Sequence, residues 1–449
     1  MQDQVVNLLA SRLEQFMTRY GYEKIETPII QPAELFLTKA GDEIINRLFT
    51  FERLGKQLAL RPEFTALAAY TYITQYPGDQ QPVLRWQFGG AVFEDAAGET
   101  QRFSIGAELL GMSGASADAE IIALAANAAI ERGLANWTLV IGHAQLMRVL
   151  LERFKLDSRT QRFLLHHLPA LRQSGKADVL ETLDKLLLGR NAPDELTLDT
   201  GSELSTQQML DVLLDATQHG VTMGGRSRHD IVRRLLQKRQ RATERAQVVA
   251  ALDFLEAWSA ISAPPDQALA QIEAMFQTDD SEARQILAQW RSVIGLLDAY
   301  GIPAHRIQIQ PSLARNWDYY TGIVFELWSG NNHVGGGGRY DGLTRLIGGE
   351  RDVPAVGFAY YVDPLLDSLP KIKPAAPPLI AIASSSENAA AAIRWAQSLR
   401  EHGHTVILLG LDDQTDEPPY VAQSDGTLHQ GSREFATLES LINDLEMVR

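Results

Sequence analysis

The segment over residues 315–328 constrains the fold most, because it has the pattern of a β-strand with polar groups at its entrance. It reads Arg-Asn-Trp-Asp-Tyr-Tyr-Thr-Gly-Ile-Val-Phe-Glu-Leu-Trp, and from residue 323 its side chains alternate between two faces, as those of a strand do. Ahead of the strand, Arg315 offers donors for a carboxylate, and Tyr319 and Tyr320 offer flat apolar faces with hydroxyl tips. These groups suit a small zwitterion, but an ordinary strand and turn would also explain the segment.

A run of four glycines follows, within the sequence Gly-Gly-Gly-Gly-Arg-Tyr-Asp-Gly-Leu over residues 335–343. Glycine tolerates positive φ and lets a ligand approach the backbone closely. A plain hairpin turn would use the same residues. The two segments together favour a binding site on a sheet, and both explanations of the glycines stay open.

The charge of the chain argues against a large nucleic-acid surface. Its 449 residues carry a net charge of -15, so the field of the whole molecule repels polyanions. The one basic tract, residues 226–245, could contact phosphate, but a solvated helix face explains it more simply. The chain has no cysteine, and its ten histidines show no paired spacing typical of zinc. We therefore expect no metal and no cofactor.

The N-terminal segment does not have the pattern of a secretory signal. It is amphipathic and contains Asp3 and Glu14 where a signal would have a basic region followed by an apolar run. No run of about 18 apolar residues occurs in the chain. We expect a cytoplasmic protein without a membrane segment.

The pattern along the chain predicts an α+β fold in which helices flank an antiparallel sheet. A helix is expected from about residue 5 to 20, ended by Gly21, and another from Pro62 to about Tyr72. Residues 83–94 and 103–110 should form a hairpin. The other predicted strands cover residues 21–32, 57–60 and 323–328.

Changes in composition divide the chain into parts. Residues 1–145 and 301–369 are expected to form the sheet core, interrupted by a mainly helical insertion over residues 146–300. A proline-rich linker at 370–378 leads to a small α/β domain at 379–449. In that domain we predict one strand-helix-strand unit and a last helix.

Taken together, these segments resemble the histidyl-tRNA synthetase family and, within it, the regulatory subunits of ATP phosphoribosyltransferase more closely than the ligases. Residues 21–36 are similar to the dimer-interface motif of class II synthetases, residues 60–65 to the strand-to-helix segment, and residues 88–111 to the second class motif. The segments at 315–326 and 335–343 match the two signatures of the histidine family. The resemblance implies a class II synthetase-like core, a helical insertion and a truncated relative of an anticodon-binding domain.

The resemblance also implies a histidine pocket. By position, Glu63 and Thr65 correspond to groups at the ammonium of histidine, and Glu108 and Tyr320 to groups at its imidazole. Arg315 corresponds to an arginine near the carboxylate, as a guanidinium suits that group. The expected histidine-binding residues are Glu63, Thr65, Ser104, Glu108, Arg315, Tyr319, Tyr320 and Tyr340.

Three positions depart from the ligase pattern that the resemblance supplies. Ser104 stands where the ligases have a glutamine. Glu94 stands where an arginine binds the α-phosphate of ATP, and residues 360–364, which end in Pro364, lack the arginine that binds the γ-phosphate. Each charge-assisted hydrogen bond of this kind is worth roughly 1.5–3 kcal/mol, so aminoacyl-adenylate formation should be slower by several orders of magnitude.

The resemblance therefore implies a chain with no catalytic residues of its own, which serves as the regulatory subunit of ATP phosphoribosyltransferase. Its expected partners are a separate short catalytic subunit and the ligand histidine, within a hetero-oligomer built on a homodimer. No tRNA is expected, because the tail is short and is acidic around residues 412–417. Two alternatives stay open: a divergent histidine-tRNA ligase, and a histidine-binding scaffold for another partner.

Overall fold

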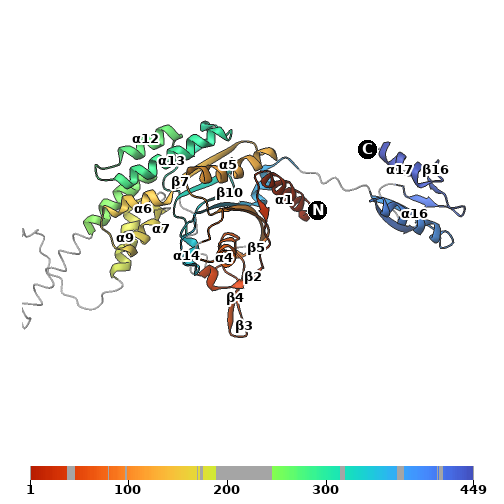
Figure 1. Ribbon diagram of the computed structural model, residues 1–449, viewed down its shortest axis with the longest axis horizontal. Helices are drawn as coiled ribbons and strands as arrows, with labels where there is room; N and C mark the ends of the chain where they lie inside the picture. Colours follow the sequence, from red (N-terminus) through yellow and green to blue (C-terminus); the bar gives the residue numbers. More distant parts are fainter. Residues whose placement is uncertain are drawn as a thin grey trace, which may run out of the picture. The chain divides into compact units, whose positions relative to one another are not determined.

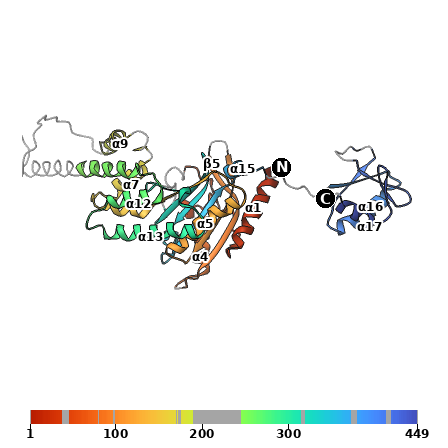
Figure 2. The ribbon, with the colours of Figure 1, turned by 90° about the horizontal axis from the view of Figure 1, so that it is seen from above.

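The computed structural model describes residues 2–37, 46–78, 80–96, 99–168, 170–171, 175–188, 245–313, 319–371, 379–411, 413 and 418–447. The chain divides into two compact units, Met1–Lys371 and Ile372–Arg449, and each is described by itself. The first unit holds a large sheet with helices around it, and the second is a small α/β unit (Figure 1, Figure 2).

An eight-stranded mixed sheet forms the centre of the first unit, with the strand order β1-β5-β6-β11-β10-β9-β7-β8. Its neighbouring strands are antiparallel except for β1 with β5 and β7 with β8, which are parallel. The predicted α+β fold is confirmed. The strands are β1 (Glu23–Lys24), β5 (Leu84–Ala96), β6 (Glu99–Leu110), β7 (Trp137–His143), β8 (Ile307–Ile309), β9 (Ile323–Ser329), β10 (Asn332–Arg339) and β11 (Ala355–Tyr361).

The predicted hairpin and the predicted strand after residue 322 are both confirmed. β5 and β6 pair from Leu84 with Leu110 to Ala96 with Glu99, with a register shift near the turn. β9 begins at Ile323, and its alternating side chains place Val324 in the core cluster on one face of the sheet. Both faces of these strands are buried over residues 105–110 and 323–325, because helices cover the sheet on both sides.

The glycine run does not form a turn. Gly335–Gly338 lies inside β10, between β9 and β11, and none of these four glycines has positive φ. A Cβ atom at Gly337 would lie 1.9 Å from the carbonyl oxygen of Gly357, and one at Gly338 would lie 2.5 Å from the carbonyl oxygen of Ile323. Close contact between strand backbones therefore requires glycine at least at residues 337 and 338, and the alternative of a hairpin turn is wrong.

The two faces of the sheet carry different helices. On one face lies α5 (Ala115–Glu131), where the hydroxyl of Tyr360 donates to the carbonyl oxygen of Ala125 at 2.5 Å. The long helix α13 (Ser281–Ala299) packs on the outside of α5. On the opposite side of the sheet lies α4 (Thr65–Gln75), as Figure 1 shows. Because side chains alternate along a strand, Gly357 of β11 faces α4 while Tyr360 faces α5.

The predicted N-terminal helix is confirmed as α1 (Gln2–Thr18), and Gly21 beyond its end has a φ of 81°. The helix expected from Pro62 begins later, at Thr65, because Phe64 is the residue at its N-cap. The single strand expected over residues 21–32 is two short strands separated around Pro28, since proline cannot donate to a ladder. The second of these, β2 (Ile30–Pro32), joins β4 (Lys56–Leu60) and β3 (Thr50–Arg53) in a small three-stranded sheet.

The chain leaves the large sheet after β7 and returns to it at β8, the parallel neighbour of β7. Helices fill the described part of the intervening segment, so the mainly helical character expected there is observed. The basic tract at residues 226–245 lies outside the described residues apart from Arg245. The described helices are α6 (Ala144–Glu152), α7 (Ser158–His166), α9 (Lys176–Leu188), a helix over residues 245–259, α12 (Pro265–Ala274) and α13.

The second unit has a five-stranded sheet with the order β13-β12-β14-β15-β16. The predicted strand-helix-strand unit is confirmed as β12 (Leu379–Ser384), α16 (Ala389–Glu401) and β13 (Thr405–Gly410), and the last helix is α17 (Leu438–Met447). The sequence did not predict β14 (Tyr420–Ala422), β15 (Leu428–Gln430) and β16 (Arg433–Phe435), which are too short for an alternating pattern. Among the helices that the structure describes, none combines the length and apolar character that crossing a bilayer needs.

Candidate functional site

Several predicted pocket residues meet at the buried carboxyl group of Glu108, on the face of the sheet that α4 covers. Glu108 lies on β6 and is 0% exposed. The hydroxyl of Thr65, the first residue of α4, donates to its Oε1 at 2.7 Å. The hydroxyl of Tyr340, which follows β10, donates to its Oε2 at 2.5 Å. One carboxyl group thereby joins three segments that are far apart in the sequence.

Space for this carboxyl group exists because the opposing residue on β11 is a glycine. Gly357 pairs with Glu108 across the two strands. A Cβ atom at Gly357 would lie 1.5 Å from Oε2 of Glu108, which is far closer than two atoms can approach without a bond. Gly357 was not among the predicted site residues, since the sequence around it resembles any strand that contains a glycine.

A second carboxyl group, that of Glu63, lies at the N-terminus of α4. The backbone N–H of Ala66 donates to its two oxygens at 2.9 and 3.2 Å. This bond satisfies one of the amide groups that a helix leaves unpaired in its first turn, and the helix dipole favours a negative charge there. The helix that presents Thr65 to Glu108 therefore also holds Glu63 in place.

Burial raises the pKa of both carboxyl groups. The pKa of Glu108 rises from 4.5 to about 8, because burial disfavours its charged form more than the bonds from Tyr340 and Thr65 favour it. The pKa of Glu63 rises to about 7, again because burial outweighs the bonds from Ala66 and Thr65. Both groups therefore titrate near neutral pH, and a cation bound between them would favour their ionised forms.

Three tyrosines form the apolar part of the same cluster. Tyr319, Tyr320 and Tyr340 are at most 8% exposed. The ring centroid of Tyr319 lies 4.8 Å from that of Tyr320 and 5.8 Å from that of Tyr340. Burial raises the pKa of Tyr319 and of Tyr340 well above 10, so both phenols stay protonated and can donate hydrogen bonds.

An ion pair that was not expected from the sequence positions Tyr340. The guanidinium of Arg339 is buried, and it donates to Asp118 of α5 at 2.7 Å and to Asp341 at 2.9 Å. The backbone N–H of Asp341 donates to Oγ1 of Thr321 at 3.0 Å. The residues on both sides of Tyr340 are therefore anchored. A charged residue at the end of a glycine strand was the available signal for this role.

Two predicted pocket residues are not brought to Glu108 by the described structure. Ser104 lies on the same face of β6 but four residues earlier, about 14 Å along the strand. It pairs with Gly90 on one side and Tyr361 on the other. Arg315, the expected partner of a ligand carboxylate, lies outside the described residues.

Glu94, which stands where the resemblance implies a lost phosphate-binding arginine, has two arginine neighbours that the sequence did not reveal. Glu94 accepts hydrogen bonds from Arg102 of β6 and, at 3.5 Å, from Arg47. The Glu94 side chain is 22% exposed, against 37% for Arg102 and 41% for Arg47. Neither arginine was among the predicted residues. This corner of the sheet therefore contains two cations, and Glu94 forms ion pairs with both.

Residues 360–364, where the resemblance implies the loss of the arginine that binds the γ-phosphate, contain no basic side chain. Tyr360 is 1% exposed and faces α5. Pro364 lies in the first turn of α15 (Val362–Ser368). The end of β11 and the start of α15 therefore offer no cation to a phosphate from these five residues.

The geometry defines what the cluster can do chemically. Two carboxyl groups with a pKa near neutrality can neutralise an ammonium or an imidazolium, and hydroxyl groups and aromatic rings fix the orientation of a small planar group. Burial strengthens each of these interactions, because little water competes. The cluster suits a compact cationic or zwitterionic ligand.

Comparison of the sequence with known proteins shows the family of this chain. The family model described as histidyl-tRNA synthetase matches residues 2–189 and 203–365. An ATP phosphoribosyltransferase regulatory subunit from Agrobacterium fabrum is 31% identical over 360 residues, which cover 78% of this chain and 94% of that protein. A histidine-tRNA ligase from Thermococcus kodakarensis is 27% identical over 367 residues, covering 80% of this chain and 69% of the ligase.

Two solved structures share the fold. One is described as an ATP phosphoribosyltransferase regulatory subunit/histidyl-tRNA synthetase from Bacillus halodurans, with a TM-score of 0.61 at 21% identity over 92% of this chain and 90% of that one. The other, histidyl-tRNA synthetase from Nostoc sp. PCC 7120, has a TM-score of 0.65 at 16% identity over 100% of this chain and 96% of that one. At such identities the likeness concerns the fold alone.

Proposed function

The chain belongs to the histidyl-tRNA synthetase family, which here includes ATP phosphoribosyltransferase regulatory subunits about 31% identical to it, and from this premise we propose that it is such a regulatory subunit. It binds histidine in the Glu63 and Glu108 cluster, and it is required for the activity of a separate short catalytic subunit. It performs no synthetase chemistry of its own. Histidine feedback on the first step of histidine biosynthesis passes through it.

One contrast within the sheet carries the proposal. The cluster at Glu108 brings together two carboxyl groups and hydroxyl groups suited to the ammonium and the imidazole of histidine, while Glu94 forms ion pairs with both arginines at the corner where a ligase would bind phosphate. A triphosphate would have to displace Glu94 from these arginines and then lie beside its carboxylate. At an effective dielectric of 20, two unit charges about 4 Å apart interact with roughly 4 kcal/mol, which here is repulsion.

The regulatory mechanism is thermodynamic linkage. Histidine binding draws protons off Glu63 and Glu108 and engages α4, β6 and the segment after β10 through Thr65 and Tyr340. If the cluster binds histidine more tightly in one arrangement of the complex, histidine shifts the population toward that arrangement. A difference of about 1.4 kcal/mol between two arrangements changes their ratio tenfold.

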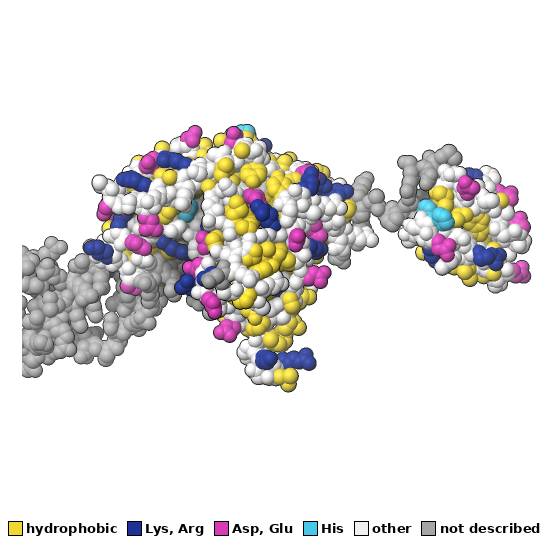
Figure 3. Space-filling view, in the orientation of Figure 1, with side chains coloured by type: hydrophobic (Ala, Val, Ile, Leu, Met, Phe, Trp, Pro, Cys, Tyr) yellow, Lys and Arg dark blue, Asp and Glu magenta, His cyan; other side chains and the backbone are white. Residues whose placement is uncertain are grey.

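A homodimer within a larger hetero-oligomer is part of the proposal. Apolar side chains are exposed on and beside the small sheet, with exposed fractions of 53% for Ile30, 37% for Phe51 and 44% for Ile29. Figure 3 shows hydrophobic side chains over the part of the first unit where this sheet lies. Exposed apolar groups of this kind are typical of a surface that another chain covers.

One observation favours a second candidate, a divergent histidine-tRNA ligase. Arg102 and Arg47 place positive charge beside Glu94, where a ligase would bind the α-phosphate of ATP, although neither occupies the position of the ligase arginine. The similarity to the ligase of Thermococcus kodakarensis is also consistent with it. In that case, a substrate triphosphate would have to displace Glu94 during each cycle.

The test combines this chain with a short-form ATP phosphoribosyltransferase catalytic subunit. We expect phosphoribosyl-ATP formation only when both chains are present, and inhibition by histidine. The Glu108→Gln variant should still activate the partner but should bind histidine about 10–100-fold more weakly in calorimetry, since one charge-assisted hydrogen bond is lost.

Other outcomes would identify the alternatives. Histidine-dependent exchange of pyrophosphate into ATP by this chain alone would favour the ligase. Histidine binding with neither a complex nor a change in catalytic-subunit activity would favour a scaffold for another partner. Unchanged histidine affinity in Glu108→Gln would remove the assignment of the pocket.

A further inference from the structure

A cavity of about 470 Å³ lies where β7, β8 and β9 form one end of the large sheet. Part of its floor is a row of side chains from these strands, because Val140 of β7 pairs with Gln308 of β8 on one side and with Glu326 of β9 on the other. A cavity of this size is large enough for a small organic molecule. Nothing in the proposed function uses it.

The cavity lies on the same face of the sheet as the Glu108 cluster but is separate from it. Through the cross-strand pairs of β10 and β11, Glu326 lies in one row with Gly106, the residue two before Glu108 on β6. Three strand spacings, about 14 Å, therefore separate the two sites. Leu313 borders both, since it lines the cavity and also packs in the core cluster with Tyr320. A molecule in the cavity is therefore a ligand other than the one at Glu108.

Two uncharged polar side chains of the cavity have unused hydrogen-bonding capacity. Ser312 is 6% exposed, and within the described part of the chain its hydroxyl has no hydrogen-bond partner. The half-buried side-chain amide of Gln310 likewise has none among the described residues. Gln308 donates from its amide nitrogen to the hydroxyl of Ser262 at 2.7 Å, which fixes the plane of that amide. Because buried polar groups are rarely left unpaired, this lining suits a neutral ligand with both donors and acceptors.

Trp328 gives the cavity an aromatic wall of fixed orientation. Its indole ring stacks on the imidazole of His333, with the ring centroids 4.7 Å apart and the planes 13° apart. The indole N–H donates to Oε2 of Glu326 at 3.0 Å. The indole is thereby held on one face and at its nitrogen, while its half-buried surface in the cavity can pack against a flat ligand.

The lining of the cavity disfavours a phosphate and favours an amino group. Among the described residues that line it, none is basic, and the one charged side chain is that of Glu326. Its carboxylate already accepts from Trp328 and has lone pairs for a further N–H group. The amide of a glutamine matches the amino group and the neighbouring ring nitrogen of adenine. Gln310 and Glu326 therefore suit the edge of an amino-substituted heterocycle.

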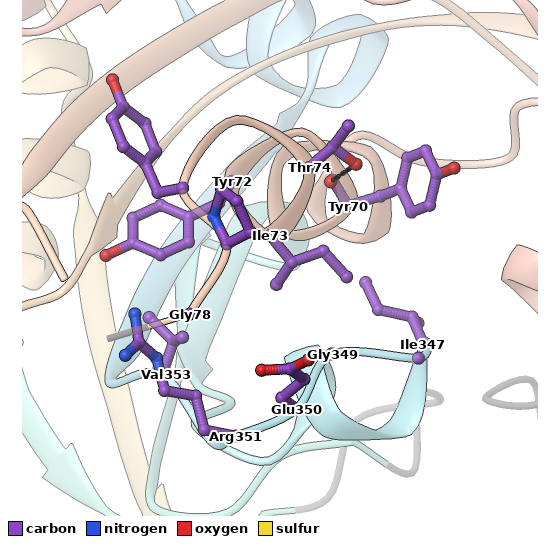
Figure 4. Close-up of a pocket in the computed structure, with 13 residues that line it drawn as sticks. Tyr70, Tyr72, Ile73, Thr74, Gly78, Ile347, Gly349, Glu350, Arg351 and Val353 are labelled. Atoms are coloured by element: carbon purple, nitrogen blue, oxygen red, sulfur yellow. Dashed lines mark hydrogen bonds between the residues drawn. The ribbon is translucent and has the colours of Figure 1, made fainter. Parts of the chain in front are cut away.

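Another cavity, of about 300 Å³, offers no comparable selection. It lies between the C-terminal end of α4 and the loop after α14 (Leu343–Leu346). Figure 4 shows both Glu350 and Arg351 in it, so its lining contains opposite charges. The guanidinium of Arg351 also donates to the carbonyl oxygen of Gln80. The charges there select neither a cation nor an anion, and we assign that cavity no ligand.

We infer that the cavity at β7, β8 and β9 binds the base of a purine nucleoside that carries an amino group, with adenine as the type. Gln310 and Ser312 bond to ring nitrogens, Glu326 accepts from the amino group, and the base packs on Trp328. A phosphate on the sugar adds nothing to the affinity, because no described residue of the lining is basic. The inference goes beyond the proposed function, since it concerns a second ligand and needs no partner chain.

The first test is calorimetric titration of the full chain with adenosine, AMP and inosine. We expect adenosine to bind, and AMP to bind no more tightly than adenosine. Inosine should bind about tenfold more weakly, because a carbonyl oxygen replaces its amino group and would face the carboxylate of Glu326. No measurable binding of adenosine, or much tighter binding of AMP, would overturn the proposal.

Variants then locate the site. Gln310→Leu should weaken adenosine binding about tenfold, and Ser312→Ala about threefold, because each removes a hydrogen-bonding group. Ser312→Ala removes a buried hydroxyl that has no partner in the described part of the chain, so the free energy of unfolding in urea should not fall. Gln285→Leu is the matched control, since Gln285 is exposed on α13 and does not line the cavity, and it should bind adenosine as wild type does.

Two results with these variants would contradict the assignment. One is an equal adenosine affinity in wild type, Gln310→Leu and Ser312→Ala, which would place the base outside the cavity. The other is a loss of adenosine binding in Glu108→Gln, which would place the base in the Glu108 cluster instead.

Discussion

The two ends of β6 differ in the carboxyl group that each involves, Glu108 of β6 itself at one end and Glu94 of β5 at the other. Glu108 is fully buried and bonded to two hydroxyl groups, whereas Arg102, six residues earlier and about 20 Å away along the strand, is partly exposed and bonded to Glu94. Partly exposed ion pairs contribute little free energy, about 0–1 kcal/mol, while a buried carboxyl group responds strongly to each neighbour. Substitutions beside Glu108 should therefore have the larger effects, and substitutions at the ion pairs of Glu94 the smaller ones.

The largest effect should come from Gly357→Ala. The added Cβ atom would meet Oε2 of Glu108 at 1.5 Å, so the carboxyl group would have to leave its hydroxyl donors. Overpacking of this kind costs roughly 1–3 kcal/mol, and the loss of buried hydrogen bonds adds to it. We expect a lower free energy of unfolding in urea and no measurable histidine binding in calorimetry.

Gly295→Ala is the control for that substitution. Gly295 lies in α13, and apart from its chain neighbours and the backbone of its own helix no described atom lies within 4 Å of a Cβ built there. Alanine is favoured over glycine in a helix by about 1 kcal/mol, so this variant should be as stable as wild type or more so. Normal histidine binding by Gly357→Ala would show that the Glu108 carboxyl group is not the ligand-binding group.

A smaller effect is expected in the pH dependence of stability. The folded-state pKa of Glu108 is raised to about 8 from 4.5, so the folded state holds its proton more tightly than the unfolded state does. For a raised carboxyl pKa, stability is greatest at low pH and falls as the pH rises from about 4.5 to 8. Glu108→Gln cannot titrate, so the free energy of unfolding should fall less steeply with pH in this variant than in wild type. The difference is at most about 1.4 kcal/mol per pH unit.

Glu63, with its pKa of about 7, should account for part of the slope that remains in that variant. Glu282→Gln, which changes an exposed carboxyl group at the start of α13, should leave the wild-type slope intact. Equal slopes for wild type and Glu108→Gln between pH 5 and 8 would contradict the burial argument. Urea unfolding at several pH values, followed by tryptophan fluorescence, measures the slope.

The smallest effect is expected at the ion pairs that Glu94 forms with Arg102 and Arg47. Glu94→Gln removes the carboxylate that forms ion pairs with Arg102 and Arg47, so both arginines become available to a triphosphate. We expect ATP to bind a few-fold more tightly, with the gain reduced at high salt because the groups are exposed. Glu52→Gln, a change of the same charge on the exposed strand β3, is the control. Equal ATP affinity in the two variants would mean that these arginines do not face the nucleotide.

The cluster residues that the sequence led us to expect differ in one respect from the neighbours that it did not indicate. Glu63, Thr65, Glu108 and Tyr340 were expected from the family resemblance of the short segments that contain them, and the structure brings them together. Gly357 was not located, because its role depends on the residue opposite it in another strand. The pairing of Arg339 with Asp118, 221 residues away, is likewise not visible in either segment alone. The pairing of Glu94 with Arg102 and Arg47 is also a contact that the sequence did not indicate.

By itself, the sequence determined the strands with period-two alternation, the first helix, the family, and the kinds of side chain available to a ligand. The tertiary structure alone decided that the glycines of β10 serve strand contact rather than a turn, that the two pocket carboxyl groups titrate near neutrality, and that Glu94 has two arginine partners. The reason is physical: periodicity is a property of neighbours along the chain. Burial, close approach and charge pairing depend on distances between residues that only the fold brings together.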